Sequence, residues 1–571
     1  MKNLQAARVF ENIAALMEIS GESPFKVNAY RNAANTFASL TDDLEQLAAR
    51  GELRSIPGVG EAIEKKTLEI LETGTCGLYE RLKQQFPLTI LELLDLPGVG
   101  ARTVRALYEG LGVDSLEALE KAARAGRVRQ LPRMGAKAEQ RILESIERLR
   151  ARPSGIPIAR ALPLAEALAT RMQGVPGVLQ AVPAGGVRRF AELVPRVTVA
   201  VVSADPQEAL QAFLREAGGT ILESGPERAA VRLSGGEEAE CFVGRPENAG
   251  AVLIRATGSE AHLHRLEALA AEMGYSFEGV TLLNPRGESL SCPDEESFYS
   301  ALGMSPVPPE LREDGGEVEA ALKENLPALI QTSDLKGDLH AHTVFSDGSG
   351  TLEQMAEAAR RLGYEYLAIT DHSQALTVAR GLTPERLSEQ GRLIDAFNAS
   401  GTDIRLLKGV EVDIRPDGSL DLPDESLAAL DWVVASIHSH FALSRQEMTE
   451  RAVRALSSPY VHVQAHPTGR LIGSRDPHAL DVDALIEAAA RAGKALEINS
   501  YPERLDLSAE NARKAADAGV KIVVSTDSHH PAHLPKVSYG IGTARRAGLT
   551  AGDVLNTLPL DALLEWARSR R

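Results

Sequence analysis

The stretch Leu335-Lys336-Gly337-Asp338-Leu339-His340-Ala341-His342 decides how the C-terminal part of this 571-residue chain folds. A short apolar run leads directly into two histidines, and Asp347 follows in the next loop. Buried apolar runs of this length are typical of strands in a parallel sheet. Imidazole and carboxylate side chains placed directly after such a run are typical of metal ligands.

The same order recurs along the chain after residue 334, where seven apolar runs alternate with amphipathic helices. That rhythm predicts a parallel sheet or barrel. Six of the seven runs present His, Asp or Glu at or just past their C-terminal end. The runs and the residues that follow them are Leu335–Leu339 with His340, His342 and Asp347; Tyr366–Thr370 with Asp371 and His372; Leu406–Val410 with Glu411; Trp432–Ile437 with His438; Val461–Ala465 with His466; Ala495–Ile498 with Asn499; and Ile522–Thr526 with Asp527 and His529.

The C-terminal ends of parallel barrel strands share one rim, so these side chains are expected to converge there. Clustered carboxylates need cations to neutralise them, and a mixture of imidazole and carboxylate suits zinc, manganese or iron. A single histidine is more often structural than a metal ligand. A structural role does not explain why His, Asp or Glu follows six of the seven apolar runs. The histidines outside the pattern are interpreted as structural: His440, His462, His478, His530 and His533.

The motifs Asp338-Leu339-His340-Ala341-His342, Thr370-Asp371-His372, Gly409-Val410-Glu411, His438-Ser439-His440, His466-Pro467 and Asp527-Ser528-His529 resemble those of the polymerase-and-histidinol-phosphatase (PHP) family. The resemblance implies a distorted (β/α)7 barrel over residues 335–571 and a site for three divalent metals, Mn²⁺ or Zn²⁺. It implies catalytic roles for Glu411, Asp527 and His372. The implied groups are His340, His342, Glu411 and Asp527; Glu411, His438 and His466; and Asp347, His372 and His529.

The net charge of −17 argues against nucleic-acid binding when it is taken for the whole chain. Residues 1–150 are neutral, however, and within them 121–150 hold nine basic and three acidic residues. This run is either part of a polyanion-binding surface or an ordinary solvated helix. The three cysteines form no CxxC motif and no run is apolar enough to span a membrane, so we expect a cytoplasmic protein.

A repeat in the N-terminal region carries glycines directly before helical stretches. Ser55-Ile56-Pro57-Gly58-Val59-Gly60 and Asp95-Leu96-Pro97-Gly98-Val99-Gly100 are two copies, and Gln130-Leu131-Pro132-Arg133-Met134-Gly135 is a weaker third. Glycine lets another backbone approach closely, and the amides at a helix start can bind a phosphate. The repeat resembles helix-hairpin-helix motifs, which hold the DNA backbone without reading its sequence.

The front half resembles a bacterial family X DNA polymerase. The segment Phe25–Ala34, with Lys26 and Tyr30, is similar to the part of that family that binds the 5′-phosphate of a gap. Lys66 stands where the family has its Schiff-base lysine, although we favour an ordinary solvated lysine there. The expected domains are a helical domain (1–75), a fingers-like domain (76–155), a degenerate palm (156–240), a thumb-like part (241–305), a linker (306–334) and the PHP barrel (335–571).

The polymerase site departs from the family pattern. Arg196 and Thr198 stand where the first two metal-binding aspartates belong, and Glu240 stands for the third. Gly185-Gly186 lacks the phosphate-binding hydroxyl that precedes Arg188 and Arg189. A two-metal mechanism needs several anionic ligands, so no Mg²⁺ is expected in the palm.

The leading hypothesis is a DNA-repair protein whose PHP site acts as a metal-dependent 3′–5′ exonuclease on gapped DNA, with abasic-site or 3′-phosphate processing as further options. Its partners would be DNA carrying a gap, 5′-phosphate or abasic site, besides other repair proteins, and we expect a monomer that binds no membrane. The alternative keeps gap-filling DNA synthesis. Two others are a phosphatase for small molecules and a non-catalytic DNA-binding scaffold.

Overall fold

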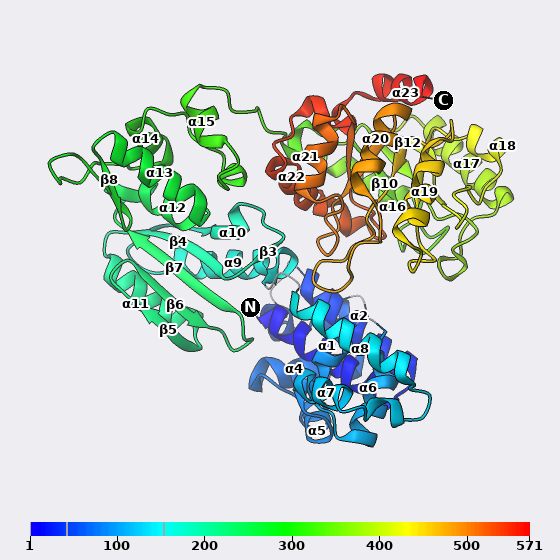
Figure 1. Ribbon diagram of the computed structural model, residues 1–571, viewed down its shortest axis with the longest axis horizontal. Coiled ribbons are helices and arrows are strands. Elements are labelled where there is room, and N and C mark those ends of the chain that lie inside the picture. Colours follow the sequence, from blue (N-terminus) through cyan, green and yellow to red (C-terminus); the bar gives the residue numbers. More distant parts are fainter. Residues whose placement is uncertain (1, 41–43, 57, 97, 152–154, 571) are drawn as a thin grey trace. The chain divides into compact units, whose positions relative to one another are not determined.

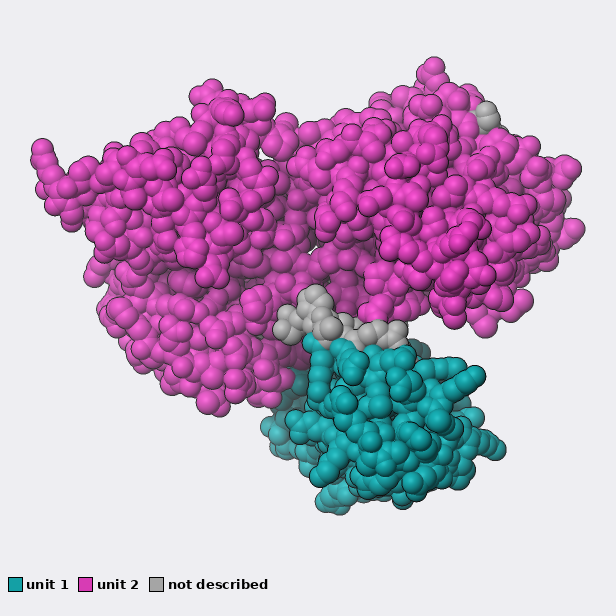
Figure 2. Space-filling model, viewed as in Figure 1, with its two compact units in different colours: residues 1–153 teal, residues 154–571 magenta. Residues whose placement is uncertain are grey.

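The computed structural model describes residues 2–40, 44–56, 58–96, 98–151 and 155–570. The chain divides into two compact units, residues 1–153 and residues 154–571 (Figures 1 and 2). In the described residues, none of the helices combines the length and apolar character that crossing a membrane requires.

The first unit is built from helices that pack around one apolar core (Figure 1). Helix α1 begins this unit and buries Phe10, Ile13 and Leu16. The helices are α1 (Lys2–Ser20), α2 (Pro24–Ser39), α3 (Leu44–Ala49), α4 (Glu61–Thr73), α5 (Gly77–Gln85), α6 (Ala101–Leu111), α7 (Leu116–Arg124) and α8 (Ala136–Ala151), with short 3₁₀ turns at Leu53–Ser55, Leu88–Asp95 and Val128–Gln130.

The glycine repeat forms the same turn at all three places. Gly58 and Gly98 have φ values of +84° and +82°, and Arg133 takes the same left-handed conformation at +66° in the third copy. Glycine adopts this conformation without strain, which is why the first two copies need it. Gly60 and Gly100 lie directly before α4 and α6, and a Cβ built at either would meet nothing within 4 Å.

The second unit begins with a five-stranded mixed sheet in the order β2-β4-β7-β6-β5, in which only the β4–β7 pair is parallel. The predicted border between palm and thumb at residue 240 falls inside β7. The strands are β2 (Val178–Ala184), β4 (Val197–Ser203), β5 (Thr220–Ser224), β6 (Arg228–Arg232) and β7 (Glu238–Gly244). The short strands β1 (Ile156–Pro157) and β3 (Leu193–Val194) pair beside it, and β8 (Ser276–Glu278) pairs with β9 (Thr281–Leu283).

Six helices belong to the described residues of this part of the chain. They are α9 (Ile158–Gln173), α10 (Gly185–Arg188), α11 (Pro206–Ala217), α12 (Ala249–Thr257), α13 (Glu260–Glu272) and α14 (Glu295–Ala301). In Figure 1 α11 lies on one side of the sheet and α12, α13 and α14 lie on the other.

The stretch 306–334, expected to be a linker, is packed against its neighbours. It forms α15 (Glu317–Leu322), and Val307, Val318 and Ala321 join the apolar core of the thumb-like part. Arg312 is 1% exposed and its guanidinium donates to Val307 O and to Glu295. The stretch is therefore not a free linker, because its apolar residues bury enough surface to fix the segment.

The last part is a barrel of seven parallel strands in chain order. A parallel bridge between Ala341 and Ser528 brings the two edge strands together. The seven predicted runs are β10 (Gly337–Ala341), β11 (Tyr366–Ile369), β12 (Arg405–Asp413), β13 (Trp432–Ser436), β14 (Val463–Gln464), β15 (Ala495–Asn499) and β16 (Ile522–Ser525). Glu411 lies inside β12 rather than past its end, because β12 pairs with β11 only up to Lys408 and then continues along β13.

Helices surround the strands (Figure 1): α16 (Leu352–Arg361), α17 (Pro384–Ala399), α18 (Asp424–Ala428), α19 (Arg445–Leu456), α20 (Val482–Ala492), α21 (Ala509–Asp517), α22 (Val537–Arg546) and α23 (Leu560–Ser569). Apolar side chains between strands and helices form the larger core. A second core joins Leu339, Tyr366 and Trp432 from the strands with Leu563 and Trp566 of α23.

The two edge strands are joined by the side chain of Asn556, which is fully buried. Its Nδ2 donates to Gly337 O of β10 at 2.9 Å and to Val524 O of β16 at 2.7 Å. Its Oδ1 accepts from Val524 N at 3.1 Å. This one amide therefore pairs backbone groups of both edges, which would otherwise be buried without partners.

We predict that Asn556→Leu lowers the free energy of unfolding of the barrel by about 2–4 kcal/mol, because each orphaned buried backbone group costs about 1–3 kcal/mol. Both tryptophans of the chain, Trp432 and Trp566, lie in the barrel, so their fluorescence during urea unfolding reports on this part alone. Asn325→Ala, at an exposed position, is the matched control and should shift the transition little. A transition in Asn556→Leu that matches the control would contradict the prediction.

Candidate metal centre

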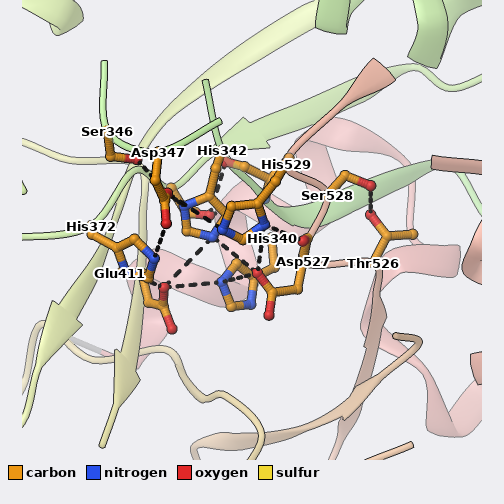
Figure 3. A network of polar contacts seen from close by, with 12 residues as sticks. His340, His342, Ser346, Asp347, His372, Glu411, Thr526, Asp527, Ser528 and His529 are labelled. Carbon is orange, nitrogen blue, oxygen red and sulfur yellow. Dashed lines mark hydrogen bonds and ion pairs between the residues drawn. The ribbon is translucent and has the colours of Figure 1, made fainter. Parts of the chain in front are cut away.

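The predicted ligand side chains converge at the C-terminal ends of the barrel strands, as Figure 3 shows for His340, His342, Asp347, His372, Glu411, Asp527 and His529. Three groups of these residues place their ligand atoms within 4.8 Å of one another. They are His342, Asp347, His372 and His529; His340, His342 and Asp527; and His372, Glu411 and His438. The grouping differs from the one expected, since His342 and His372 each belong to two groups.

Glu411 is the centre of the cluster and is 1% exposed. Its Oε1 lies 3.0 Å from His466 Nε2 and 3.2 Å from His438 Nε2. Its Oε2 lies 2.7 Å from His372 Nδ1, with the Nε2 atoms of His340 and His342 at 3.5 and 3.6 Å. One carboxylate therefore faces five imidazoles, which is the arrangement that a bridging ligand requires.

Two further carboxylates complete the cluster. Asp527 Oδ1 lies 3.1 Å from His342 Nε2 and 3.7 Å from His340 Nε2. Asp347 Oδ1 lies 3.4 Å from His529 Nε2, and its Oδ2 lies 3.6 Å from His372 Nε2. All nine residues predicted as ligands thus lie in one continuous cluster.

The charge pattern fits a site for cations. Burial alone would raise the pKa of Glu411, but the imidazoles of His372, His438 and His340 outweigh it and hold the pKa well below its usual value. Burial would lower the pKa of His438, but Glu411 and Asp413 raise it to about 10. Within the described residues, His340 Nε2, both nitrogens of His342, Glu411 Oε2 and Asp527 Oδ1 are buried without hydrogen-bond partners. Buried polar atoms rarely lack partners, so the donor set fits metal ions.

Backbone conformation supports the same site. His466 and Asp527 have positive φ values, +28° and +52°, and each stands two residues past the end of its strand, β14 and β16. Such conformations cost on the order of 1–3 kcal/mol in residues other than glycine and cluster at functional sites. Here they turn two ligand side chains back into the barrel mouth.

Sequence reasoning missed Glu497, a fully buried carboxylate of β15. Its Oε1 lies 2.7 Å from His340 Nδ1 and accepts from Ser525 Oγ at 2.6 Å. Its Oε2 accepts from His466 N at 2.6 Å. With Nε2 directed at the cluster, His340 donates its Nδ1 proton to Glu497, which fixes the ring. The sequence feature that could have identified Glu497 is its position as a charged residue inside the apolar run Ala495–Ile498.

Asp371 and Asp338 also support the site without belonging to the ligand groups. Asp371 accepts from Thr343 N and Oγ1 at 2.8 and 2.6 Å and from Ser346 N at 3.1 Å, which holds the loop that carries Asp347. Asp338 accepts from Thr526 Oγ1 at 2.5 Å, one residue before Asp527. Burial raises the pKa of Asp338 to about 6, against these hydrogen bonds.

In the first unit, Tyr30, one of the residues expected to meet DNA, lies beside the candidate lysine. The Lys66 ammonium lies 5.7 Å from the centre of the Tyr30 ring and donates to Ala62 O at 3.1 Å. Lys26 is exposed and pairs with Glu22 at 2.9 Å. Lys66, Tyr30, Gly58, Gly60, Gly98 and Gly100 are all placed in the first unit, and their roles stay predictions.

The residues of the predicted degenerate polymerase site contact one another. Glu240 accepts from Thr198 Oγ1 at 2.9 Å and from Arg228 at 2.7 Å, and Arg196 lies 3.6 Å away. A Cβ built on Gly185 would come within 2.5 Å of Thr198 Oγ1, so the loop before Arg188 is packed against this strand.

The two arginines that follow Gly186 are also engaged. Arg188 makes a bidentate pair with Glu295 at 2.8 and 2.7 Å. Arg189 pairs with Glu313 at 2.7 Å and donates to Thr257 O at 2.6 Å. Burial would raise the pKa of Glu295, but Arg188 and Arg312 hold it at about 2, so Glu295 is ionised and neutralises Arg188.

Comparison with known families assigns four parts of the chain. Residues 1–76 match a helix-hairpin-helix domain, and residues 90–148 match a SAM-like helix-hairpin-helix tandem. Residues 252–313 match the DNA polymerase beta thumb, and residues 338–501 match the PHP domain. The fold and the site thus define a PHP-type phosphoesterase joined to DNA-binding modules. The barrel continues beyond the matched range, and its predicted ligands Asp527 and His529 lie after residue 501.

The relatives specify the family. The chain is 37% identical over 558 residues to the "DNA polymerase/3'-5' exonuclease PolX" of Bacillus subtilis (strain 168), covering 97% of both chains. It therefore belongs to the PolX family. A "Probable phosphatase" of Thermoanaerobacter sp. (strain X514) is 30% identical over 239 residues, 38% of this chain and 89% of that protein. One from Acetivibrio thermocellus is 34% identical over 201 residues, 34% of this chain and 78% of that protein.

We predict that Glu497→Gln weakens metal binding about 10- to 100-fold, because carboxylates that orient a ligand histidine contribute this much to affinity. Equilibrium dialysis with Mn²⁺ or Zn²⁺, followed by elemental analysis, measures the change. Glu487→Gln, on the outer face of α20 with an exposed side chain, is the control for the charge. Equal affinities in the wild type and Glu497→Gln would rule out the orienting role.

Proposed function

We propose that the protein is a metal-dependent 3′–5′ exonuclease of DNA repair, and that the barrel rim is its phosphodiester-cleaving site. The observation that carries the proposal is the cluster around Glu411, in which nine ligand side chains meet and several buried ligand atoms lack partners. The name of the B. subtilis relative, which includes 3′–5′ exonuclease, supports the direction of cleavage.

Each predicted ligand has a place in this proposal. Glu411 would bridge metals through its two oxygens, while Asp527 and Asp347 would supply the remaining negative charge on either side. Divalent metals held there would lower the pKa of a bound water and neutralise the phosphate oxygens. The supporting residues Glu497, Asp371 and Asp338 keep the ligands in place. We propose Mn²⁺ or Zn²⁺, because imidazole and carboxylate ligands suit both.

DNA would be held by the first unit. The amides that follow Gly60 and Gly100 are presented at helix starts with no side chain in front of them, which suits contacts with backbone phosphates. Gapped, 5′-phosphorylated or abasic DNA is the proposed substrate. Lyase action by Lys66 stays a prediction, as do the partner proteins, the monomeric state and the cytoplasmic location.

We also propose that templated DNA synthesis is lost. Mg²⁺ would need several unpaired carboxylates in the palm, but Glu240 is already paired with Arg228 and lies beside Arg196. A nucleotide triphosphate would need free cations, but Arg188 is neutralised by Glu295. The gap-filling alternative therefore has less support from the geometry than the exonuclease.

Asp527→Ala and Glu411→Ala should each lower the rate of exonuclease cleavage by at least about a thousandfold, since a lost metal ligand removes several kcal/mol of transition-state stabilisation. The measurement uses an end-labelled gapped duplex with Mn²⁺. Binding of the same duplex, followed by fluorescence anisotropy without metal, should be unchanged, because the first unit is intact. Undiminished cleavage in both variants would refute the assignment, and a small-molecule phosphatase would hydrolyse phosphomonoesters but leave the duplex uncut.

The palm should not extend a primer. In an Asp527→Ala background, in which product is not degraded, a one-nucleotide gap with Mg²⁺ or Mn²⁺ should give no template-directed extension. A true gap-filling member of the family serves as the positive control. Clear extension would restore the gap-filling alternative to first place.

A further inference from the structure

Loops that follow the barrel strands carry cations that make no ion pair with a carboxylate in the described part of the chain. They are Arg380 after β11, Arg415 after β12, Arg475 after β14, Arg504 after β15 and Lys536 after β16. Several arginines on the outer helices form ion pairs instead, as in Arg360–Glu357, Arg445–Asp481 and Arg491–Glu487. In a chain with a net charge of −17, unpaired cations around this rim call for a functional explanation.

Arg475 and Arg504 lie close to each other in this ring. Arg475 donates its Nε proton to Gly469 O at 2.8 Å, which leaves the rest of its guanidinium available. Burial lowers the pKa of Arg475, and the neighbouring Arg504 guanidinium lowers it further. The buried Asp506 carboxyl acts on both guanidinium groups in the opposite direction, but one carboxylate serves two arginines, so a phosphate bound beside them would be stabilising.

Two of the rim cations lie over aromatic rings. The Arg475 guanidinium carbon is 5.3 Å from the centre of Phe441, and Lys536 Nζ is 4.6 Å from the centre of Tyr501. Phe441 is 42% exposed and follows the ligand His438 by three residues, so the two backbones lie at most about 11 Å apart. Tyr501 comes two residues after Asn499, whose amide donates to Asp527 Oδ2 at 3.1 Å.

The loop that carries Phe441 is held by contacts with His478 and Arg451. The His478 ring stacks on Phe441, with centroids 4.9 Å apart and an interplanar angle of 11°. His478 is 8% exposed, and its Nε2 has no hydrogen-bond partner among the described residues. The buried Arg451 donates to Ser439 O at 2.8 Å, two residues before Phe441. The expectation that His478 is structural is therefore incomplete, because it supports an exposed ring beside the metal centre.

We propose that this rim, defined as Phe441, Arg475, Tyr501, Arg504 and Lys536, binds a single-stranded DNA end leading into the metal centre. The arginines and the lysine would contact backbone phosphates. The exposed parts of the two rings, whose faces already meet His478, Arg475 and Lys536, would contact unpaired bases. Single-stranded nucleic-acid sites combine these two elements, a cationic groove and aromatic stacking surfaces. A small phosphate ester would need only the charges inside the cluster and would leave the rim unused.

This proposal rests on the proposed exonuclease function and names its substrate as an unpaired 3′ end. The test compares the full-length wild type with Arg475→Gln/Arg504→Gln, and Arg491→Gln serves as the control for charge. Two substrates are used with Mn²⁺: an end-labelled single-stranded oligonucleotide and bis(4-nitrophenyl) phosphate, which has no bases and one phosphate.

The double variant should raise KM for the oligonucleotide about tenfold or more, and the slope of log KM against log salt should fall by about 1.4, since each lost phosphate contact removes about 0.7. Hydrolysis of bis(4-nitrophenyl) phosphate should be unchanged. An unchanged KM and salt slope would overturn the rim proposal while leaving the exonuclease standing. A wild type that hydrolyses the small ester but never the oligonucleotide would overturn both.

A second measurement needs no metal and no turnover. An oligonucleotide with 5-iodouracil at its 3′ end is irradiated with the metal-free protein, and the adducts are mapped by mass spectrometry. Adducts are expected on Phe441 or Tyr501, with less product in Phe441→Ala than in Leu362→Ala, a control at a similarly exposed apolar position. Adducts confined to residues 1–153 would contradict the proposal.

Discussion

Glu411 is almost completely withdrawn from water and yet has five imidazole nitrogens within 3.6 Å of its two oxygens. These imidazoles come from the ends of β10, β11, β13 and β14, so the contacts exist only when the barrel is closed and its register is correct. A buried charge without compensation is very costly. The order of the strands, the strained backbone at His466 and Asp527, and the supporting carboxylates all serve to keep this one group compensated.

The barrel and the palm neutralise their carboxylates with different side chains. In the barrel the carboxylates face histidines, which can release a proton and bind metal instead. In the palm Glu240 faces Arg228 and Arg196, which stay charged at any physiological pH. The barrel can therefore bind an exchangeable metal cation. In the palm, the guanidinium groups of Arg228 and Arg196 already neutralise Glu240.

Much of the site could be predicted because the ligands follow apolar runs, and each run proved to be a strand. The grouping of the ligands could not be predicted in full, because it depends on side-chain geometry: His372 was expected apart from Glu411, yet its Nδ1 lies 2.7 Å from it. Glu497 was missed since its partner His340 is 157 residues away. The stretch 306–334 was expected to be a linker, but the burial of Arg312 depends on Glu295 and Val307, which no local pattern reveals.

The pairing inside the palm has a consequence for the history of the fold. An aspartate reintroduced at position 198 would lie opposite Glu240 in the parallel ladder, and the guanidinium groups of Arg196 and Arg228 would still occupy the space of a metal. Arg196→Asp alone would supply a carboxylate and remove one cation, but Arg228 would still pair with Glu240. If synthesis is lost as proposed, restoring a metal site would take more than one substitution, and the sheet would remain as a scaffold between the first unit and the barrel in the chain order.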